Sequence, residues 1–144
     1  MPLCTFAAAL MGSMLPKLAS AISIALISVY SLLPQAERIN TGMSGGLEHL
    51  FAYGLTGFLL TLARGAAHSP VTAVISLAGV ASLLEWLQHW APGRHPNISD
   101  AVISTAASAL GAALAAWLRD VVLRTINRRG LLGVATGETN DKGA

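Results

Sequence analysis

Residues 71–91, VTAVISLAGVASLLEWLQHWA, decide the fold class of this chain. Glu85, near the end of the segment, is its only Asp, Glu, Lys or Arg. A helix needs about 20 mostly apolar residues to cross the hydrocarbon core of a bilayer. Pro70 and Pro92 border the segment, where a missing backbone N–H costs a helix least. The sequence therefore predicts a transmembrane helix at residues 71–91.

Three further apolar segments predict three more transmembrane helices. They cover residues 18–33, 47–63 and 101–118. Of the 144 residues, 53% are hydrophobic and 11% are charged, whereas a soluble domain carries about 25% charged residues. The single Cys4 excludes a disulfide scaffold, and a net charge of +2 is too small for a nucleic-acid-binding surface. We predict an all-α membrane protein, a four-transmembrane-helix bundle whose partner is the lipid bilayer and not a nucleic acid.

Two flanking segments complete the expected domain organisation around residues 18–118. Residues 1–17 are predicted to be an N-terminal apolar segment, either cytoplasmic or part of the first helix, with Met11 or Met14 as alternative starts. Residues 119–144 are predicted to be a basic juxtamembrane segment, helical for about two turns, followed by a cytoplasmic tail that is disordered from Gly133.

Basic residues predict the orientation of the bundle. With four spans, the N-terminus, the 64–70 turn and the C-terminal tail share one side of the membrane. That side holds seven of the nine Lys and Arg residues, whereas the 34–46 and 92–100 loops hold only Arg38 and Arg94. Because basic residues favour the cytoplasmic side, we expect both termini in the cytoplasm and the two longer loops outside.

The strongly polar residues in or beside the spans are expected at the outer end. They are Glu48, His49, Glu85, Gln88, Arg94 and Asp100. Glu85, Gln88 and His89 have the spacing of one helix face. A buried Glu85 needs a partner, for which Arg94 is the natural candidate, and Asp100 is placed to cap the fourth helix. We interpret these residues as a functional cluster.

A second group of residues is expected to serve helix packing. Small residues at i+4 spacing let helices approach closely in lipid. In the second and fourth spans the candidates are Gly54, Gly57, Ser104, Ser108 and Gly111.

Several motifs together resemble the signature of VanZ-like membrane proteins. The motifs are Glu85-Trp-Leu-Gln88, Pro92-Gly93-Arg94, Ile98-Ser-Asp100, Gly111, and His49 four residues before Tyr53. The resemblance covers about residues 46–118, although Gly45-Gly46 replaces an acidic–basic pair common in that family. It implies a multi-pass protein of the bacterial cytoplasmic (inner) membrane. The family takes its name from a protein that lowers sensitivity to teicoplanin, a glycopeptide that acts on cell-wall precursors.

The expected function is that of a non-enzymatic envelope protein. Its outward-facing cluster would bind a lipid head group, a lipid-linked cell-wall precursor or a partner membrane protein. The sequence predicts no catalytic residue, no cofactor and no metal site. One alternative is a membrane enzyme that acts on a lipid-linked substrate. Its candidate residues are Glu48, His49, Glu85, His89, His95 and Asp100, but they lack a paired metal-ligand spacing. Another alternative is a small proton-coupled transporter with Glu85 as the relay.

Overall fold

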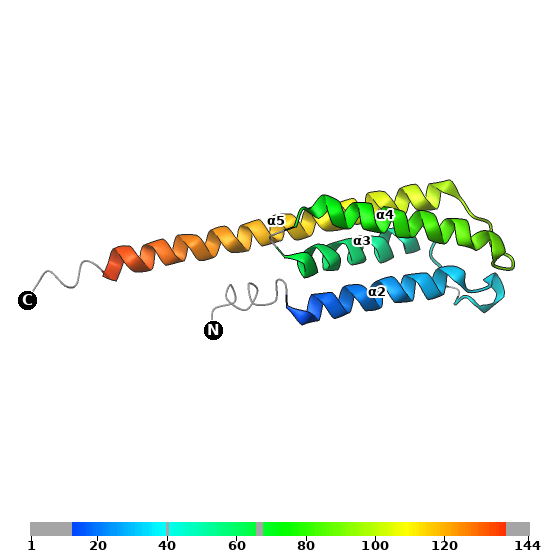
Figure 1. Ribbon diagram of the computed structural model, residues 1–144, viewed down its shortest axis with the longest axis horizontal. Coiled ribbons are helices and arrows are strands. Elements are labelled where there is room, and N and C mark those ends of the chain that lie inside the picture. The colour runs from blue at the N-terminus through cyan, green and yellow to red at the C-terminus, as the bar shows by residue number, and fades with distance from the viewer. Residues whose placement is uncertain (1–12, 40, 66–67, 138–144) are drawn as a thin grey trace, which may run out of the picture.

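The computed structural model describes residues 13–39, 41–65 and 68–137, and their regular structure is entirely helical. The helices are α2 (Met14–Leu32), α3 (Gly45–Arg64), α4 (Pro70–Leu87) and α5 (Ile98–Gly137). Two short 3₁₀ turns, η1 (Gln35–Glu37) and η2 (Gln88–Trp90), follow α2 and α4. Consecutive helices run in opposite directions, so the α2–α3 and α4–α5 connections lie at the same end (Figure 1). The prediction of an all-α protein is confirmed.

Helix α2 begins earlier than predicted. Its first residue is Met14 rather than residue 18, and Pro16 lies in its first turn. The first backbone N–H groups of a helix have no partner within it, so proline is tolerated there. Residues 14–17 of the predicted N-terminal segment therefore belong to the first helix, while residues 1–12 lie outside the described residues.

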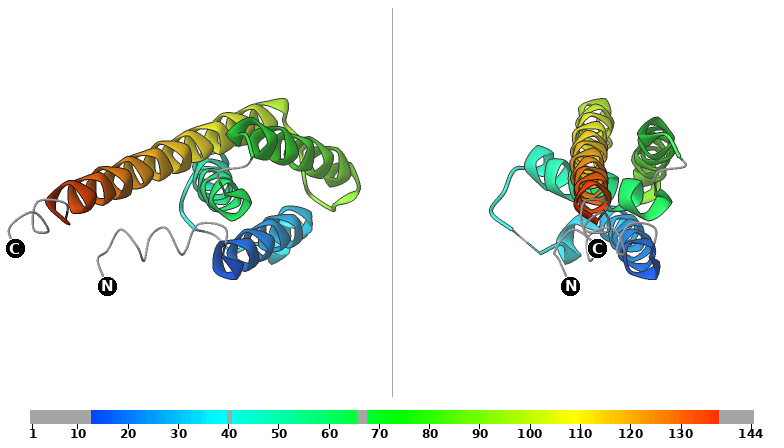
Figure 2. Two further views of the ribbon diagram at one scale, coloured as in Figure 1. Left: turned by 60° about the vertical axis from the view of Figure 1, so that its left-hand side comes forward. Right: turned by 90° about the vertical axis from the view of Figure 1, so that its left-hand side faces the viewer.

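Helix α5 is much longer than predicted. It continues to Gly137, so the prediction of disorder from Gly133 is wrong for residues 133–137, and residues 138–144 lie outside the described residues. The last proline in the chain is Pro96. A glycine inside a helix costs only about 1 kcal/mol relative to alanine, so Gly130 and Gly133 need not end it. As a result, α5 extends well past the other helices (Figures 1 and 2).

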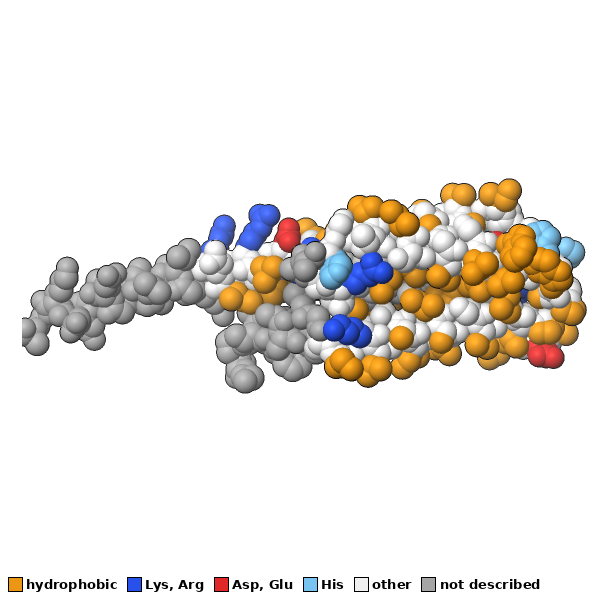
Figure 3. Space-filling model, in the orientation of Figure 1, with side chains coloured by type: hydrophobic (Ala, Val, Ile, Leu, Met, Phe, Trp, Pro, Cys, Tyr) orange, Lys and Arg blue, Asp and Glu red, His pale blue; other side chains and the backbone are white. Residues whose placement is uncertain are grey.

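Apolar side chains cover the outside of the bundle, and small polar ones lie inside it. Thr56 and Ser108 are fully buried at 0% exposure, whereas Leu110 and Trp117 are 67% and 62% exposed. A band of hydrophobic side chains spans the visible face between basic groups and a second polar end (Figure 3). A soluble protein shows the opposite distribution, because its surface must face water. This arrangement is typical of a membrane protein.

Three segments within the described residues are long and apolar enough to cross a membrane. They are Met14–Leu32, Pro70–Trp90 and Ile98–Arg128. Helix α3 has 20 residues but carries Glu48, His49 and Arg64, which lower its mean hydropathy. By length and composition, three of the described helices qualify as spans. The prediction of four also counted α3, which is less apolar than the other three.

Helices α3 and α5 make the closest contact in the bundle. A Cβ atom added to Gly57 would lie 2.5 Å from the Ser108 carbonyl oxygen, and one added to Gly111 would lie 2.0 Å from the Gly54 carbonyl oxygen. Both distances are shorter than the non-bonded contacts that Cβ atoms make, so the absence of these side chains lets the two backbones touch. This contact holds the start of α5 against the start of α3, where the polar residues lie.

Candidate functional site

The predicted polar residues come together at the end of the bundle that holds the α2–α3 and α4–α5 connections. Glu48 and His49 lie in the first turns of α3, Glu85 and Gln88 at the end of α4, and Asp100 in the first turn of α5. Arg94 lies in the α4–α5 connection. The antiparallel arrangement brings these separate parts of the sequence to one place (Figure 1).

Glu48 is bound by residues of the α2–α3 connection. Its carboxylate accepts a hydrogen bond from the Thr41 hydroxyl and pairs with the Arg38 guanidinium at 2.7 Å. The Arg38 guanidinium carbon lies 4.4 Å from the centre of the Tyr30 ring, within the range of a cation–π contact. The sequence reasoning missed Arg38, Thr41 and Tyr30 as parts of the site. The sequence does contain one signal for Arg38: it and Arg94 are the only Lys or Arg residues in the two connections at this end.

His49 contacts two residues of α5. Its Nδ1 lies 3.1 Å from the Ser104 hydroxyl oxygen, and its Nε2 lies 3.9 Å from a carboxylate oxygen of Asp100. The ring stacks on Tyr53, with the ring centres 6.0 Å apart and the planes at 15°. Ser104 is 1% exposed, so this serine, expected only to allow close packing, also supplies a buried polar contact to the site.

Asp100 does not cap α5 with its side chain. The cap is Asn97, whose side-chain oxygen accepts a hydrogen bond from the Ser99 backbone N–H at 3.1 Å. Asn97 precedes the helix, in the position where a side chain can reach the second backbone N–H, whereas Asp100 is already the third helical residue. The carboxylate of Asp100 is consequently available to His49.

Glu85 and Arg94 do not form the predicted ion pair. Glu85 is 9% exposed, and its carboxylate accepts a hydrogen bond from the Asn97 backbone N–H at 3.0 Å. Arg94 instead turns toward the end of α2, where it donates to the Ser31 carbonyl oxygen at 3.0 Å and to the Gln35 side-chain oxygen at 3.4 Å. The connection positions the Asn97 amide, rather than the guanidinium, next to the Glu85 carboxylate.

Arg94 carries a charge with little local compensation. Within the described residues it forms no ion pair at 4 Å or less. Burial, followed by the charge of Arg38, lowers the pKa of Arg94, and the carboxylates of Glu85, Asp100 and Glu48 act in the opposite direction. The site therefore holds a partly desolvated cation whose direct hydrogen-bond acceptors are neutral oxygens.

A small cavity of about 50 Å³ lies between the end of α2 and the start of α3. It is lined by Ile27, Tyr30, Ser31, Arg38, Glu48, His49, Ala52, Tyr53 and Arg94. A single water needs about 10–15 Å³, so the cavity has room for several waters or a small oxyanion. The Nε atoms of both lining arginines are buried without a hydrogen-bond partner. An acceptor bound between these arginines would satisfy groups that the protein itself leaves unpaired.

Three further polar residues lie near the site: Gln88 is buried, whereas His89 and His95 are exposed. Gln88 is 4% exposed and its side-chain nitrogen has no hydrogen-bond partner. His89 is exposed, and its Nδ1–H donates to the Trp86 carbonyl oxygen at 2.9 Å. The sequence spacing places Glu85, Gln88 and His89 on one helix face, but only Glu85 and Gln88 are buried, because Gln88–Trp90 form the 3₁₀ turn η2 rather than a further α-helical turn. His95 is also exposed.

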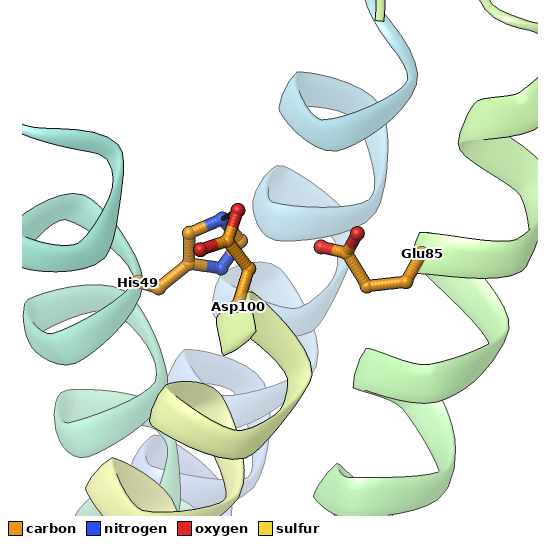
Figure 4. Close-up of side chains that lie close together, drawn as sticks. All are labelled: His49, Glu85 and Asp100. Carbon is orange, nitrogen blue, oxygen red and sulfur yellow. Dashed lines mark ion pairs between the residues drawn. The ribbon is translucent and has the colours of Figure 1, made fainter. Parts of the chain in front are cut away.

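His49, Glu85 and Asp100 form the tightest group of titratable side chains at this end (Figure 4). One possible metal-ligand atom from each residue lies within 4.8 Å of those from the other two. The three residues come from α3, α4 and α5 respectively. Sequence spacing alone does not indicate such a group, because its members are separated by 36 and 15 positions.

Comparison of the whole chain with models of protein families, with curated proteins and with solved structures found no match in any of the three. The geometry of the polar end and the motifs in the sequence are therefore what a functional assignment must be built on.

Proposed function

We propose that this chain is a VanZ-like integral membrane protein of the bacterial cytoplasmic membrane, with all four helices crossing the bilayer and both termini in the cytoplasm. Apart from Gly111, which packs against Gly54 further along the helices, the residues that carry the resemblance lie together at one end of the bundle. Lys17, Arg64 and Arg119 mark the opposite end, where the Arg119 guanidinium donates to the Gly65 carbonyl oxygen at 2.8 Å. That distribution supports an outward-facing polar end by the positive-inside rule.

The inclusion of α3 as a fourth span is supported by its length and by the pairing of its charge. Twenty residues at 1.5 Å per residue extend for about 30 Å, which matches the hydrocarbon core of a bilayer. Glu48 lies in the first turn of α3 and is neutralised by Arg38, which reduces the cost of its position near lipid.

The proposed role of the polar end is to bind the anionic head group of a phospholipid or of a lipid-linked cell-wall precursor. The observation that carries this proposal is Arg94, which lines a cavity together with a second arginine and is hydrogen-bonded only to neutral oxygens. Arginine favours phosphate because its planar fork of N–H donors matches two oxygens at once. A phosphate in the cavity would satisfy the unpaired Nε–H groups and offset the repulsion between Arg38 and Arg94.

Lipid binding by purified protein tests this proposal. Native mass spectrometry in detergent, with phosphatidylglycerol titrated against phosphatidylcholine, measures selective retention of the anionic lipid. We expect Arg94→Gln to weaken phosphatidylglycerol binding at least tenfold, because a charge-assisted hydrogen bond contributes about 1.5–3 kcal/mol. The matched control is Arg124→Gln, since Arg124 is 79% exposed on α5 outside the site.

Two results would contradict the proposal of a head-group site. One is equal phosphatidylglycerol binding by the wild type and Arg94→Gln, and the other is an equal loss in Arg124→Gln. A cellular assay tests the antibiotic part of the proposal separately. Expression in a susceptible host is expected to reduce teicoplanin sensitivity, and Arg94→Gln at equal membrane levels is expected to abolish that protection.

A further inference from the structure

Three side chains that commonly bind metals converge from three helices beside the arginine cavity. His49 comes from α3, Glu85 from α4 and Asp100 from α5, and their ligand atoms lie within 4.8 Å of one another (Figure 4). Two ligands bound to one ion at about 2.0–2.2 Å lie about 3–4 Å apart, so small side-chain rotations would bring all three to one ion. The His49 Nε2 and Asp100 oxygen, at 3.9 Å, already have that separation.

The contacts around His49 orient one ring nitrogen toward the carboxylates. Nδ1 lies 3.1 Å from the Ser104 hydroxyl oxygen, which can accept a hydrogen bond from the Nδ1–H group. Nε2 then presents a lone pair toward Asp100, at a distance too long for a hydrogen bond. Metal-bound histidines are held in this way, with the second ring nitrogen donating to a fixed oxygen. Ser104 is 1% exposed, so this contact is shielded from bulk water.

Glu85 is oriented in a comparable way. The Asn97 backbone N–H binds one oxygen of its carboxylate at 3.0 Å. Asn97 also caps α5, so the same residue fixes the helix that carries Asp100 and the carboxylate on α4. The other oxygen of Glu85 has no hydrogen bond from any described residue.

Two carboxylates this close to each other repel when both are charged, and neither is bound by a guanidinium. Arg38 pairs with Glu48, and the hydrogen bonds of Arg94 go to Ser31 and Gln35. A divalent cation would balance the two negative charges in a place with limited access to water.

We propose that His49, Glu85 and Asp100 bind one divalent transition-metal ion of the zinc class, through Nε2 and one oxygen from each carboxylate. An imidazole with two carboxylates suits zinc better than magnesium or calcium, which prefer oxygen ligands alone. Three protein ligands leave a fourth position for water or a ligand oxygen, as in catalytic zinc sites.

A groove reaches Glu85, one of the three proposed ligands. Its volume is about 470 Å³, and its lining includes Glu85, Trp86, His89 and Asn97. Glu85 thus belongs both to the groove and to the proposed metal site. The proposed metal site shares His49 with the arginine cavity, but Glu85 and Asp100 do not line that cavity, and the metal proposal does not depend on the proposed head-group binding.

Zinc titration of the purified full chain tests the proposal. After treatment with EDTA and its removal, isothermal titration with zinc chloride is expected to show one ion per chain, with magnesium binding much more weakly. His49→Gln, Glu85→Gln and Asp100→Asn are each expected to weaken zinc binding at least tenfold. Ser104→Ala is expected to weaken it about tenfold by releasing the histidine.

Matched controls separate the site from other residues of the same type. His95→Gln and Glu37→Gln change exposed residues at the same end and are expected to leave zinc affinity unchanged. Arg94→Gln, which tests the head-group proposal, is not expected to weaken zinc binding, because it removes a positive charge near the site. Circular dichroism and gel filtration in detergent establish that each variant is folded.

A measurement on the wild type needs no variant. Zinc is expected to raise its thermal unfolding temperature, and EDTA to reverse the increase, because a ligand that binds only the folded state stabilises it. Failure of the wild type to bind zinc would overturn the proposal. Wild-type affinity in all three ligand variants, or an equal loss in His95→Gln, would overturn it as well.

Discussion

Gly111 allows α5 to contact the backbone of α3. A Cβ atom there would lie 2.0 Å from the Gly54 carbonyl oxygen, and the obstacle is backbone rather than a flexible side chain. We expect Gly111→Ala to lower the free energy of unfolding by about 1–3 kcal/mol, because α5 must move away from α3. Unfolding by sodium dodecyl sulfate in mixed micelles, followed by far-UV circular dichroism, measures the change.

Gly79 provides the matched control for this prediction. It lies in α4, and a Cβ atom there would meet no atom within 4 Å. Gly79→Ala is expected to leave stability unchanged or to raise it by up to about 1 kcal/mol, since alanine has the higher helix propensity. Equal stability of the Gly111→Ala and wild-type proteins would show that the two backbones are not in contact.

Residue types and their position along the helices were enough to predict where the polar cluster lies, but not how its members pair. Glu48, His49, Glu85 and Asp100 are on or next to apolar helices, so their place in the bundle follows from the order of the helices. Arg38 and Arg94 are in connections, whose backbone path depends on turns and on neighbouring helices. The predicted pairing of Arg94 with Glu85 was wrong for this reason.

At the scale of the element, the start of α5 depends on its cap. The Asn97 side-chain oxygen accepts the Ser99 backbone N–H, while its own backbone N–H binds Glu85. We expect Asn97→Ala to lower the free energy of unfolding by about 1 kcal/mol, because a helix N–H loses its acceptor and the Glu85 contact remains. Asn97→Asp keeps the acceptor and is expected to retain most of the stability. The same micelle unfolding assay compares the variants, and equal losses in both would refute a capping role.

Helix ends were predicted less well than helices. The apolar segments showed where helices α2 to α5 lie, since hydrophobic length is a strong signal for membrane helices. The start of α2 and the end of α5 fell outside these segments, because a helix can continue where the side chains are no longer apolar. For α5 the one signal for such an extension is that no proline follows Pro96, whereas the extension of α2 contains Pro16, which the first turn of a helix tolerates.

At the scale of the whole molecule, cysteine labelling tests the proposed topology and the span status of α3. Cys4 is the only cysteine, so Cys4→Ser gives a background without thiols. In that background, a membrane-impermeant maleimide is expected to label Ala36→Cys in intact spheroplasts, because the α2–α3 connection is proposed to lie outside. His68→Cys, in the α3–α4 connection, is expected to react only after the membrane is opened.

The two positions serve as controls for each other, since both are exposed and lie at opposite ends of α3. Labelling of both in intact spheroplasts would mean that α3 does not cross the membrane. Labelling of His68→Cys alone would mean that the bundle has the opposite orientation.

The length of α5 has a mechanical consequence. The helix has 40 residues, which is about 60 Å at 1.5 Å per residue and twice the thickness of the hydrocarbon core. Its part beyond Arg119 therefore stands away from the bundle as a stiff rod. A flexible chain loses within a few residues the direction in which it leaves a membrane, whereas a continuous helix keeps it. Gly137 lies about 27 Å along the helix from Arg119, so any tilt or rotation of α5 within the bundle also moves this distant end.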